Sequence, residues 1–576
     1  MSGNALSIRH TKIVCTLGPA TSTEERIEAL MRAGMDVARI NFSHGTHDQH
    51  AATIQRVRAV AKRLNRPVAI LQDLQGPKIR TGTLEGGMPI FLTDGHRFVI
   101  TTRPVSGTGK IVSTTYADLP DDVKRGDTIL LSDGAIELRV TGVVKQDVIT
   151  EVIHGGTLAE HQGINLPGVA VSAPALTEKD RADLVFGVEQ GVDYIALSFV
   201  RRPDDVSAAK QLIEETLRQQ PSPCAPSPRE LHPSAYAAER TIPVIAKLEK
   251  PEAIEALDAI MGVADGLMVA RGDLGVELPL EQVPMIQKEV IARANGRGLL
   301  VITATQMLES MIEHARPTRA EASDVANAIL DGTDAVMLSA ETAIGKYPVE
   351  AVQVMARIAC ESEPYSKHGP FDHDDQRSHA HAVASAAHIL AREAGAKLIA
   401  AFTRTGTSAQ LISKERPIVP VVAYTPFEQV YRRLALWWGV MPRHSELLGT
   451  TEQLIAWVDE QLQEDKLVRK GDEVVIMGGM PVAGRARTNF VKLQHVGDKY
   501  PTPRRHRQAS RRHASAGSAP RARALRRQRR FRPTMPWVSH RAAPRATSPA
   551  SPLLARRQPQ FPALPASPAS PQSHAP

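Results

Sequence analysis

A lysine and two carboxylates stand at the ends of two apolar runs of the chain. Residues 244–249 end in Lys247, Leu248 and Glu249, and residues 267–272 lead directly into Asp273. In a strand, side chains two positions apart share a face, so Lys247 and Glu249 point the same way. Asp273 can then meet Glu249 across the strand ends, where two carboxylates with open positions suit Mg²⁺, or Mn²⁺ in its place. A lone KxE triplet is more often a surface salt bridge, so the metal hypothesis depends on the elements around it.

These two runs belong to a set of eight short apolar segments that alternate with helical stretches. Strands alternating with amphipathic helices predict parallel βα units, and eight such units predict a closed (β/α)₈ barrel. The fold class is therefore α/β, with a TIM barrel as the catalytic domain. The segments are residues 12–18, 37–42, 68–74, 193–200, 244–249, 267–272, 299–305 and 335–339.

Almost every one of these segments ends in polar or glycine-rich sequence. Barrels of this kind carry their chemistry at the C-terminal ends of the strands. Arg39, Asp73, Ser198 and Thr305 stand at such ends, as Lys247 does. We expect these side chains to converge on one site.

Five motifs at these strand ends occur in the order typical of the pyruvate kinase family. Each motif alone is suggestive, and the five together are highly specific. The chain resembles pyruvate kinases over roughly residues 11–496. The motifs are INFSHG (40–45), AKLEKP (246–251), ARGDLG (270–275), ATQMLESM (304–311) and RPTRAE (316–321).

The resemblance implies a barrel that is interrupted by a small β-rich lid domain and followed by a C-terminal α/β domain. We assign residues 1–81 and 167–360 to the barrel and 82–166 to the lid, where short strands alternate with turns. Residues 361–376 are interpreted as a linker into the effector domain at 377–498. The proline-dense residues 217–240, where the family has a short turn, are interpreted as a solvated surface loop.

The reaction implied by the resemblance moves the phosphoryl group of phosphoenolpyruvate to ADP and then protonates enolpyruvate to pyruvate. Such a transfer needs positioning and charge neutralisation more than covalent chemistry. Glu249 and Asp273 are expected to bind the Mg²⁺ that bridges the substrate carboxylate and phosphate. Lys247 is expected to neutralise charge on the phosphoryl group during its transfer. Arg39 and Arg80 offer fork-shaped donors to phosphate oxygens.

Four residues at the strand ends are expected to contact phosphoenolpyruvate. Gly272 and Asp273 begin a turn whose free backbone N–H groups can receive the substrate carboxylate. Thr305 is expected to organise the proton through water, because a hydroxyl is a poor acid by itself. Ser198 is a candidate for another substrate contact.

The nucleotide is expected to lie beside a second group of residues. By the resemblance, His44 and Pro19 flank ADP, with Arg39 and Arg80 on its phosphates. Many relatives place a lysine near ADP where this chain has Gln162. Contacts between the lid and the nucleotide therefore stay open.

One departure from the family concerns the monovalent cation. Many pyruvate kinases hold K⁺ with side chains equivalent to Asn41, Ser43 and Asp73 and a backbone carbonyl, but this chain has Leu74 and Lys78 where those relatives have Thr and Glu. A tethered ammonium carries the same charge as the ion and needs no recruitment. We expect that K⁺ is not required because Lys78 replaces it, as in the potassium-independent bacterial-type branch. The alternative is a surface-pointing Lys78 beside an ordinary K⁺ site.

A loop in the last domain has the composition of a phosphate cradle. An apolar run at 398–402 leads into this loop and then a helix, and hydroxyls with free amides at a helix N-terminus bind anions. The family binds phosphorylated effectors with such a loop, so an allosteric sugar phosphate or nucleotide is expected; an ordinary helix cap is the alternative. The loop consists of Thr403, Arg404, Thr405, Gly406, Thr407 and Ser408.

The net positive charge of the chain comes from its last residues. Residues 499–576 hold 17 Lys plus Arg and no Asp or Glu, so the net charge of +8 leaves 8 − 17 = −9 for the rest. This Arg/Pro-rich tail has no periodicity and is predicted to be disordered. A reading-frame artefact and binding to nucleic acid or another polyanion are the alternatives. Apart from the tail, nothing in the charge pattern favours nucleic acid.

The rest of the composition fits a cytoplasmic enzyme. Cys15, Cys224 and Cys360 are widely spaced, which argues against a disulfide framework and for a reducing compartment. No apolar run is long enough to span a bilayer, so no membrane partner is expected. The resemblance implies a homotetramer.

Two other functions stay open. A different Mg²⁺-dependent barrel enzyme acting on pyruvate or phosphoenolpyruvate, such as an aldolase, could share the Glu/Asp pair. It would lack Arg39, Asn41, Ser43 and Thr305 in this order. The other is a catalytically weak protein that binds polyanions through its tail.

Overall fold

The computed structural model describes residues 9–169, 171–219, 241–366, 378–446, 450–480 and 487–498. The basic tail and residues 220–240 of the proline-dense stretch lie outside these ranges. No helix within them is both long enough and apolar enough to cross a membrane.

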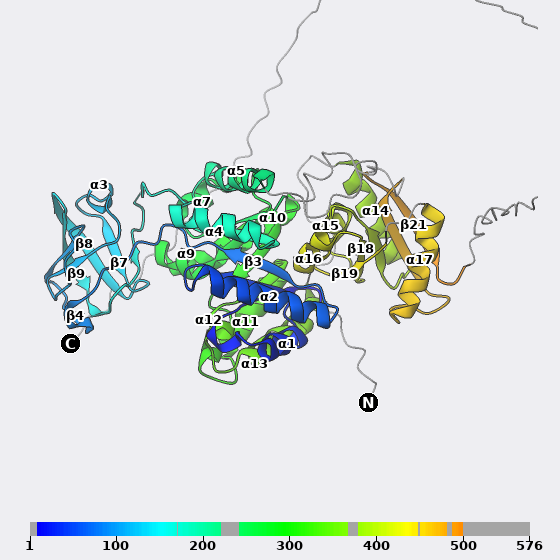
Figure 1. The fold of residues 1–576 in the computed structure, drawn as a ribbon, viewed down its shortest axis with the longest axis horizontal. Helices are drawn as coiled ribbons and strands as arrows, with labels where there is room; N and C mark the ends of the chain where they lie inside the picture. Colours follow the sequence, from blue (N-terminus) through cyan, green and yellow to red (C-terminus); the bar gives the residue numbers. More distant parts are fainter. Residues whose placement is uncertain are drawn as a thin grey trace, which may run out of the picture. The chain divides into compact units, whose positions relative to one another are not determined.

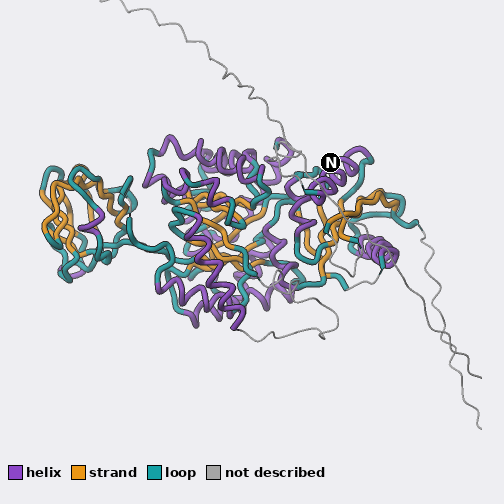
Figure 2. Tube along the Cα trace, turned by 90° about the horizontal axis from the view of Figure 1, so that it is seen from above, coloured by secondary structure: helices purple, strands orange, loops and turns teal. Residues whose placement is uncertain are grey.

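Eight parallel strands close into a barrel, and each coincides with one of the eight segments predicted from the sequence, with β14 beginning one residue earlier than predicted. Helices surround these strands, as Figures 1 and 2 show. The order around the barrel is β1-β16-β15-β14-β13-β12-β3-β2. The strands are β1 (Lys12–Thr16), β2 (Val37–Asn41), β3 (Ala69–Asp73), β12 (Tyr194–Leu197), β13 (Val244–Leu248), β14 (Gly266–Ala270), β15 (Leu300–Ala304) and β16 (Ala335–Leu338).

Threonine side chains begin several of the surrounding helices. Thr23, Thr46, Thr177 and Thr318 each accept a hydrogen bond from the backbone N–H three residues later, which satisfies a donor that the helix itself leaves unpaired. The barrel domain has helices α1 (Glu24–Ala33), α2 (His47–Arg63), α4 (Glu178–Glu189), α5 (Pro203–Gln219), α7 (Pro251–Glu255), α8 (Leu257–Met261), α9 (Arg271–Glu277), α10 (Val283–Gly296), α11 (Arg319–Asp331), α12 (Ala340–Ala343) and α13 (Pro348–Ser362).

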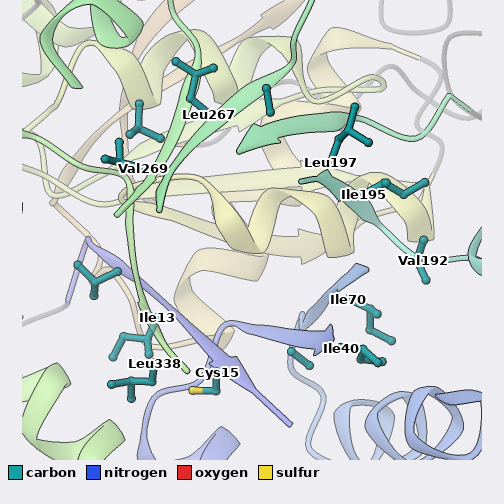
Figure 3. Packing of buried hydrophobic residues seen from close by; sticks show 14 of the residues in the cluster. Ile13, Cys15, Ile40, Ile70, Val192, Ile195, Leu197, Leu267, Val269 and Leu338 are labelled. Atoms are coloured by element: carbon teal, nitrogen blue, oxygen red, sulfur yellow. The ribbon is translucent and has the colours of Figure 1, made fainter. Parts of the chain in front are cut away.

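Alternate residues of each barrel strand face opposite sides. The outward rows, among them Ile13 with Cys15 and Ile195 with Leu197, pack with the surrounding helices in one apolar cluster (Figure 3). The inward rows, among them Ile245, fill the barrel in a separate cluster. Because side chains alternate along a strand, each inward row continues to a residue at the C-terminal edge. At that edge the residues are polar.

Four aspartates close the opposite edge of the barrel in a repeated way. Each stands immediately before a strand and accepts a hydrogen bond from the backbone N–H of the neighbouring strand, at 2.8 or 2.9 Å. The repeat places one carboxylate beneath every second strand of the barrel. The pairs are Asp36 with Ile13, Asp193 with Ile70, Asp265 with Val244, and Asp334 with Val301.

Two of these aspartates also bind cations of the C-terminal domain. Asp334 lies 2.6 Å from Lys414 Nζ and 2.9 Å from an Arg416 nitrogen, and all three side chains are buried. Burial lowers the pKa of Lys414 to about 8 although Asp334 opposes that change. Asp193 Oδ1 forms an ion pair with Arg432 Nε at 2.9 Å. The C-terminal domain is thus joined to the strand starts by buried ion pairs.

Removing the charge of Asp334 is expected to destabilise the protein. Asp334→Asn keeps an acceptor for Val301 N–H but leaves Lys414 and Arg416 buried without their anion, which costs about 3–5 kcal/mol. Asp265→Asn is the matched control, because the ion pair of Asp265 with Lys210 is partly exposed; this variant should lose about 1 kcal/mol or less. Urea unfolding midpoints measure both. Equal midpoints for the two variants would contradict the role given to Asp334.

The lid folds as a separate set of strands, as the turn-rich sequence predicts. One sheet has the order β11-β7-β8-β9-β5-β6, and β10 pairs with β4 in a second (Figure 1). The elements are β4 (Ile90–Leu92), β5 (Arg97–Thr101), β6 (Ile111–Ser113), α3 (Leu119–Asp122), β7 (Thr128–Leu131), β8 (Ile136–Val144), β9 (Asp147–His154), β10 (Gly156–Leu158) and β11 (Ile164–Asn165).

The last domain is an α/β unit around a five-stranded sheet with the order β19-β18-β17-β20-β21. Only the β20–β21 pair is antiparallel. The elements are α14 (His379–Glu393), β17 (Ile399–Phe402), α15 (Thr407–Lys414), β18 (Val421–Thr425), α16 (Glu428–Arg433), β19 (Val440–His444), α17 (Thr451–Glu464), β20 (Glu473–Gly479) and β21 (Thr488–His495).

The structure differs from the predicted linker at its start. Helix α13 continues to Ser362, and Glu363–Tyr365 form a 3₁₀ turn. Glu363 is buried and accepts hydrogen bonds from the backbone N–H groups of His10 and Thr11 at 2.6–3.0 Å. The buried carboxylate therefore packs against the N-terminal segment. Residues 367–376 of the predicted linker lie outside the described residues.

Candidate active site

A cavity of about 70 Å³ lies at the C-terminal edge of the barrel. The inward rows of the strands end there, so side chains distant in the sequence meet around one space. The sequence predicted most of its lining. The predicted residues that line it are Arg39, Asn41, Ser43, Asp73, Leu74, Lys78, Ser198, Lys247, Glu249, Asp273 and Thr305.

Lys247 is a buried ammonium surrounded by acceptors. It follows Ile245 on the inward row of β13, and its Nζ lies 2.7 Å from Glu249 Oε1, 3.2 Å from Asp73 Oδ1 and 2.7 Å from Ser198 Oγ. Burial alone would lower the pKa of Lys247, but Asp73, Glu249 and nearby Asp273 outweigh it and raise the pKa above its usual value. The side chain therefore presents a fixed positive charge to the cavity at neutral pH.

Arg39 and Asp73 form the second ion pair of the cavity. An Arg39 nitrogen lies 2.6 Å from Asp73 Oδ2, and Arg39 also donates to Thr16 Oγ at 2.9 Å. Burial would raise the pKa of Asp73, but Arg39 and Lys247 together hold it below its usual value. Asp73 therefore stays ionised and fixes both cations.

Glu249 and Asp273 give the cavity the donor set of a divalent metal. Burial, and after it the charge of Asp273, raise the pKa of Glu249, while Lys247 opposes the change. A cation bound between the two carboxylates would offset the effect of Asp273 on Glu249. Glu249 is held in place by the Phe199 N–H, which donates to Oε2 at 2.7 Å. Within the described residues no group of three or more His, Cys, Asp and Glu could hold a metal, so the pair would bind an ion that takes its other ligands from substrate and water.

Thr305 follows the last residue of β15. Its hydroxyl donates to the Ala304 carbonyl at 2.6 Å and accepts from the Gly272 N–H at 2.7 Å. Gly272 lies in the first turn of α9 beside Asp273. The predicted proton organiser, the predicted amide donor and a predicted metal ligand are therefore neighbours.

A second, larger cleft of about 230 Å³ adjoins the cavity. Lys78 and Asp273 line both spaces, which connects them. A cleft with this many cations suits a polyphosphate. Its charged and titratable lining is Lys78, Arg80, Asp133, His161, Arg201, Lys250, Glu252 and Asp273.

Arg80, Pro19, His44 and Gly272 do not line the smaller cavity. Arg80 lines the outer cleft and donates to the His161 carbonyl of the lid at 2.9 Å, because it follows the turn that leaves β3. Pro19 and His44 are exposed. Burial, followed by the charges of Lys78, Arg80 and Arg39, lowers the pKa of His44, so it lies within the field of these cations.

Comparisons with known protein families match most of the chain to one family. The family model described as pyruvate kinase, barrel domain, matches residues 8–220 and 230–352, and the model for the pyruvate kinase alpha/beta domain matches residues 381–494. The pyruvate kinase of Geobacillus stearothermophilus is 45% identical over 496 residues, covering 85% of this chain and 81% of the relative. That of Mycobacterium intracellulare is 44% identical over 490 residues, covering 85% and 99%.

The chain belongs to the pyruvate kinase family. A crystal structure of a pyruvate kinase from Cryptosporidium parvum has the same architecture, with a TM-score of 0.77 and 38% identity over 85% of this chain and 96% of that one. The resemblance seen in the five motifs is confirmed, and the chain is a phosphotransferase.

Several residues that hold this pyruvate kinase site were not predicted. Lys179 Nζ donates to the Phe42 carbonyl at 2.7 Å and pairs with Asp183 at 2.5 Å, which supports the loop after β2. Lys250 pairs with Glu277 at 2.6 Å, and Asn165 of the lid donates to the same carboxylate at 3.0 Å. The only sequence signal was position, since Lys250 stands within the AKLEKP motif.

Proposed function

We propose that this chain transfers the phosphoryl group of phosphoenolpyruvate to ADP, giving ATP and pyruvate in the last step of glycolysis. The observation that carries the proposal is Lys247, a buried ammonium fixed beside Glu249 and Asp273 in the cavity at the C-terminal edge of the barrel. Transfer of a phosphoryl group requires fixed positive charge around it more than covalent chemistry. Arg39, Asn41, Ser43 and Thr305 line that same cavity, which favours this reaction over an aldolase-type one.

Glu249 and Asp273, which both line the cavity, would hold Mg²⁺, or Mn²⁺. When bound, this ion neutralises charge and orients the oxygens of phosphoenolpyruvate. Lys247 would stabilise the phosphoryl oxygens as the P–O bond to the enol breaks. The Asp273 amide at the start of α9 would receive the substrate carboxylate, because the Gly272 N–H, expected to do so as well, is already donated to Thr305 Oγ. Ser198 would keep Lys247 in position through their 2.7 Å hydrogen bond.

ADP would lie in the outer cleft with its phosphates toward the cavity. Arg80, Lys78 and the other cations of the cleft suit a diphosphate. Gln162, which replaces the lysine of many relatives, lines the same cleft. His44 and Pro19 would flank the nucleotide from the barrel.

The proposal is tested by pyruvate formation. Purified protein with phosphoenolpyruvate and Mg²⁺ should form pyruvate only when ADP is added, as measured by lactate dehydrogenase coupled to NADH oxidation. Pyruvate formation that does not depend on ADP would indicate a hydrolase and contradict the proposal.

We also propose that K⁺ is not required and that Lys78 replaces it. Lys78 lines the same cavity as Asn41, Ser43, Asp73 and Leu74, the positions at which relatives hold the ion. Its side chain is exposed in this state, and among the described residues its ammonium has no ion pair. A lysine with this freedom can place its charge beside the phosphates once substrates bind.

Wild-type turnover is therefore expected to be full in buffer free of K⁺ and Na⁺, with tetramethylammonium as the cation. Lys78→Glu should lose activity and regain part of it with K⁺, because a carboxylate restores an anionic site. Lys62→Glu makes the same charge change at an exposed position of α2 and is the control. It should keep the wild-type activity, with or without K⁺. A tenfold rise of the wild-type rate on adding K⁺ would show that Lys78 does not replace the ion.

Regulation, assembly and location are proposed from the family. The effector loop enters α15 through Gly406, which has a φ of +95° and donates from its N–H to Thr403 Oγ at 2.8 Å. Ser408 lies 2.7 Å from Thr488, so Thr403 and Ser408 hold the turn. The exposed Thr405 and the nearby Arg404 and Thr407 would then bind a phosphorylated effector. We further propose a homotetramer in the cytoplasm.

A further inference from the structure

Thr305 reaches the cavity against the alternation of its strand. In β15 the outward row contains Val301, which packs with the surrounding helices, and the inward row contains Ile302 and Ala304. Residue 305 continues the outward row, yet Thr305 lines the cavity. The backbone explains this, because Thr305 and Gln306 have φ values of +68° and +53°. Two consecutive left-handed residues turn the chain back toward the site.

This turn is strained and must be held. A β-branched residue in the left-handed region is a genuine outlier, because its side chain clashes with the backbone. Such conformations persist only where the surrounding structure overdetermines them. The described contacts of Thr305 and Gln306 therefore identify what holds them.

Arg271 is the group that holds the turn. Its buried guanidinium donates to the carbonyls of Thr305 at 2.7 Å and Ala304 at 3.3 Å, and it contacts Met307 Sδ at 2.7 Å. Asp324 of α11 accepts from its other end at 2.8 Å. One rigid planar cation thus binds successive residues of the turn and is itself anchored from outside.

The same arrangement orients the Thr305 hydroxyl. The hydroxyl donates to Ala304 O and accepts from Gly272 N–H, the residue next to Arg271. A hydroxyl has one proton and two lone pairs, so one lone pair remains for a group in the cavity. A water that donates to it would have a defined direction.

We propose that Arg271 is a positioning residue that acts through Thr305 on the protonation of enolpyruvate. The inference rests on the proposed function. In this step the C=C electron pair of the enolate takes a proton from the oriented water, a C–H bond forms at C3, and the enolate oxygen becomes the keto oxygen. The hydroxide left behind regains its proton from solvent. Arg271 touches neither substrate nor the reacting atoms.

The test separates the proton step from the phosphoryl step. Proton exchange is measured as loss of the pyruvate methyl signal by NMR in D₂O with Mg²⁺ and ATP, and phosphoryl transfer as ATP formed in a single turnover from phosphoenolpyruvate. Arg271→Lys keeps the charge but loses the fork, and it should slow exchange about a hundredfold while ATP formation stays within about tenfold. Arg293→Lys is the control, because Arg293 is a half-buried residue of α10 that pairs with Asp258 and Glu289 and does not line the cavity; it should change neither rate.

A double variant tests whether Arg271 acts through Thr305. If it does, Arg271→Lys with Thr305→Ala should exchange no more slowly than Thr305→Ala alone. If Arg271→Lys fails to fold, Asp324→Asn, which loosens the guanidinium from the partly exposed side, should show the same split at smaller size. Equal losses in both steps, or losses that multiply in the double variant, would overturn the inference. A wild-type enzyme that forms no ATP would instead overturn the proposed function.

Discussion

Replacing Asp273 with Ala is expected to lower turnover at least a thousandfold, about 4 kcal/mol of barrier. Asp273 lines the cavity together with Glu249, whose pKa its charge raises, and removing it leaves a divalent cation with a single carboxylate. Binding of Mn²⁺, followed by electron paramagnetic resonance, should weaken in parallel. The fold should survive, because Asp273 is only half-buried at the start of α9.

The matched control removes a carboxylate outside the site. Glu281 lies exposed in the turn that follows α9, and Glu281→Ala should leave turnover and Mn²⁺ binding within about twofold of the wild type, since surface substitutions have small effects. An Asp273→Ala enzyme that behaves like Glu281→Ala at ordinary Mg²⁺ would remove Asp273 from the metal site.

Replacing Lys247 with Met is expected to have a comparable effect on turnover. Removing a preorganised charge or donor from a site that excludes water costs about a hundredfold to a thousandfold. Met fills a similar volume, but it leaves Asp73 and Glu249 without the ammonium that lies 3.2 and 2.7 Å away. The loss should appear in kcat more than in KM, because the ammonium interacts most strongly with the phosphoryl group in the transition state.

Ser198→Ala is the control for position without charge. It removes only the hydroxyl that accepts from Lys247 at 2.7 Å and donates to the Leu74 carbonyl. We expect a loss of about tenfold, or about 1.4 kcal/mol, near the lower end for one hydrogen bond to a charged group. A Lys247→Met enzyme with a kcat no lower than that of Ser198→Ala would show that the ammonium does not stabilise the phosphoryl group.

The sequence predicts the barrel and most of its cavity for a simple reason. Strand alternation places every second residue inside, so Arg39, Asp73, Ser198 and Lys247 follow inward-facing apolar residues to the same edge. A motif alone gives only the residue types. Motifs combined with this alternation also predict that these side chains meet at one edge of the barrel, as they do around the cavity.

The features that escaped prediction depend on contacts between distant segments. Thr305 was expected in the site from its strand-end position, but the left-handed turn held by Arg271, which brings it in against the strand alternation, was not predicted. Arg80 follows a turn, where the alternation no longer applies, and it reaches a lid carbonyl. Glu363 appeared to belong to a polar linker, but it is buried against backbone N–H groups of the N-terminal segment. None of these partners is close in sequence.

We propose above all that the residues of this cavity transfer the phosphoryl group of phosphoenolpyruvate to ADP. ³¹P NMR of the wild-type protein with both substrates and Mg²⁺, in buffer without K⁺, tests it most directly. We predict that the phosphoenolpyruvate signal is replaced by the γ-phosphoryl signal of ATP, one for each pyruvate formed. Release of the phosphorus as inorganic phosphate, or an unchanged phosphoenolpyruvate signal with folded protein, would contradict the account.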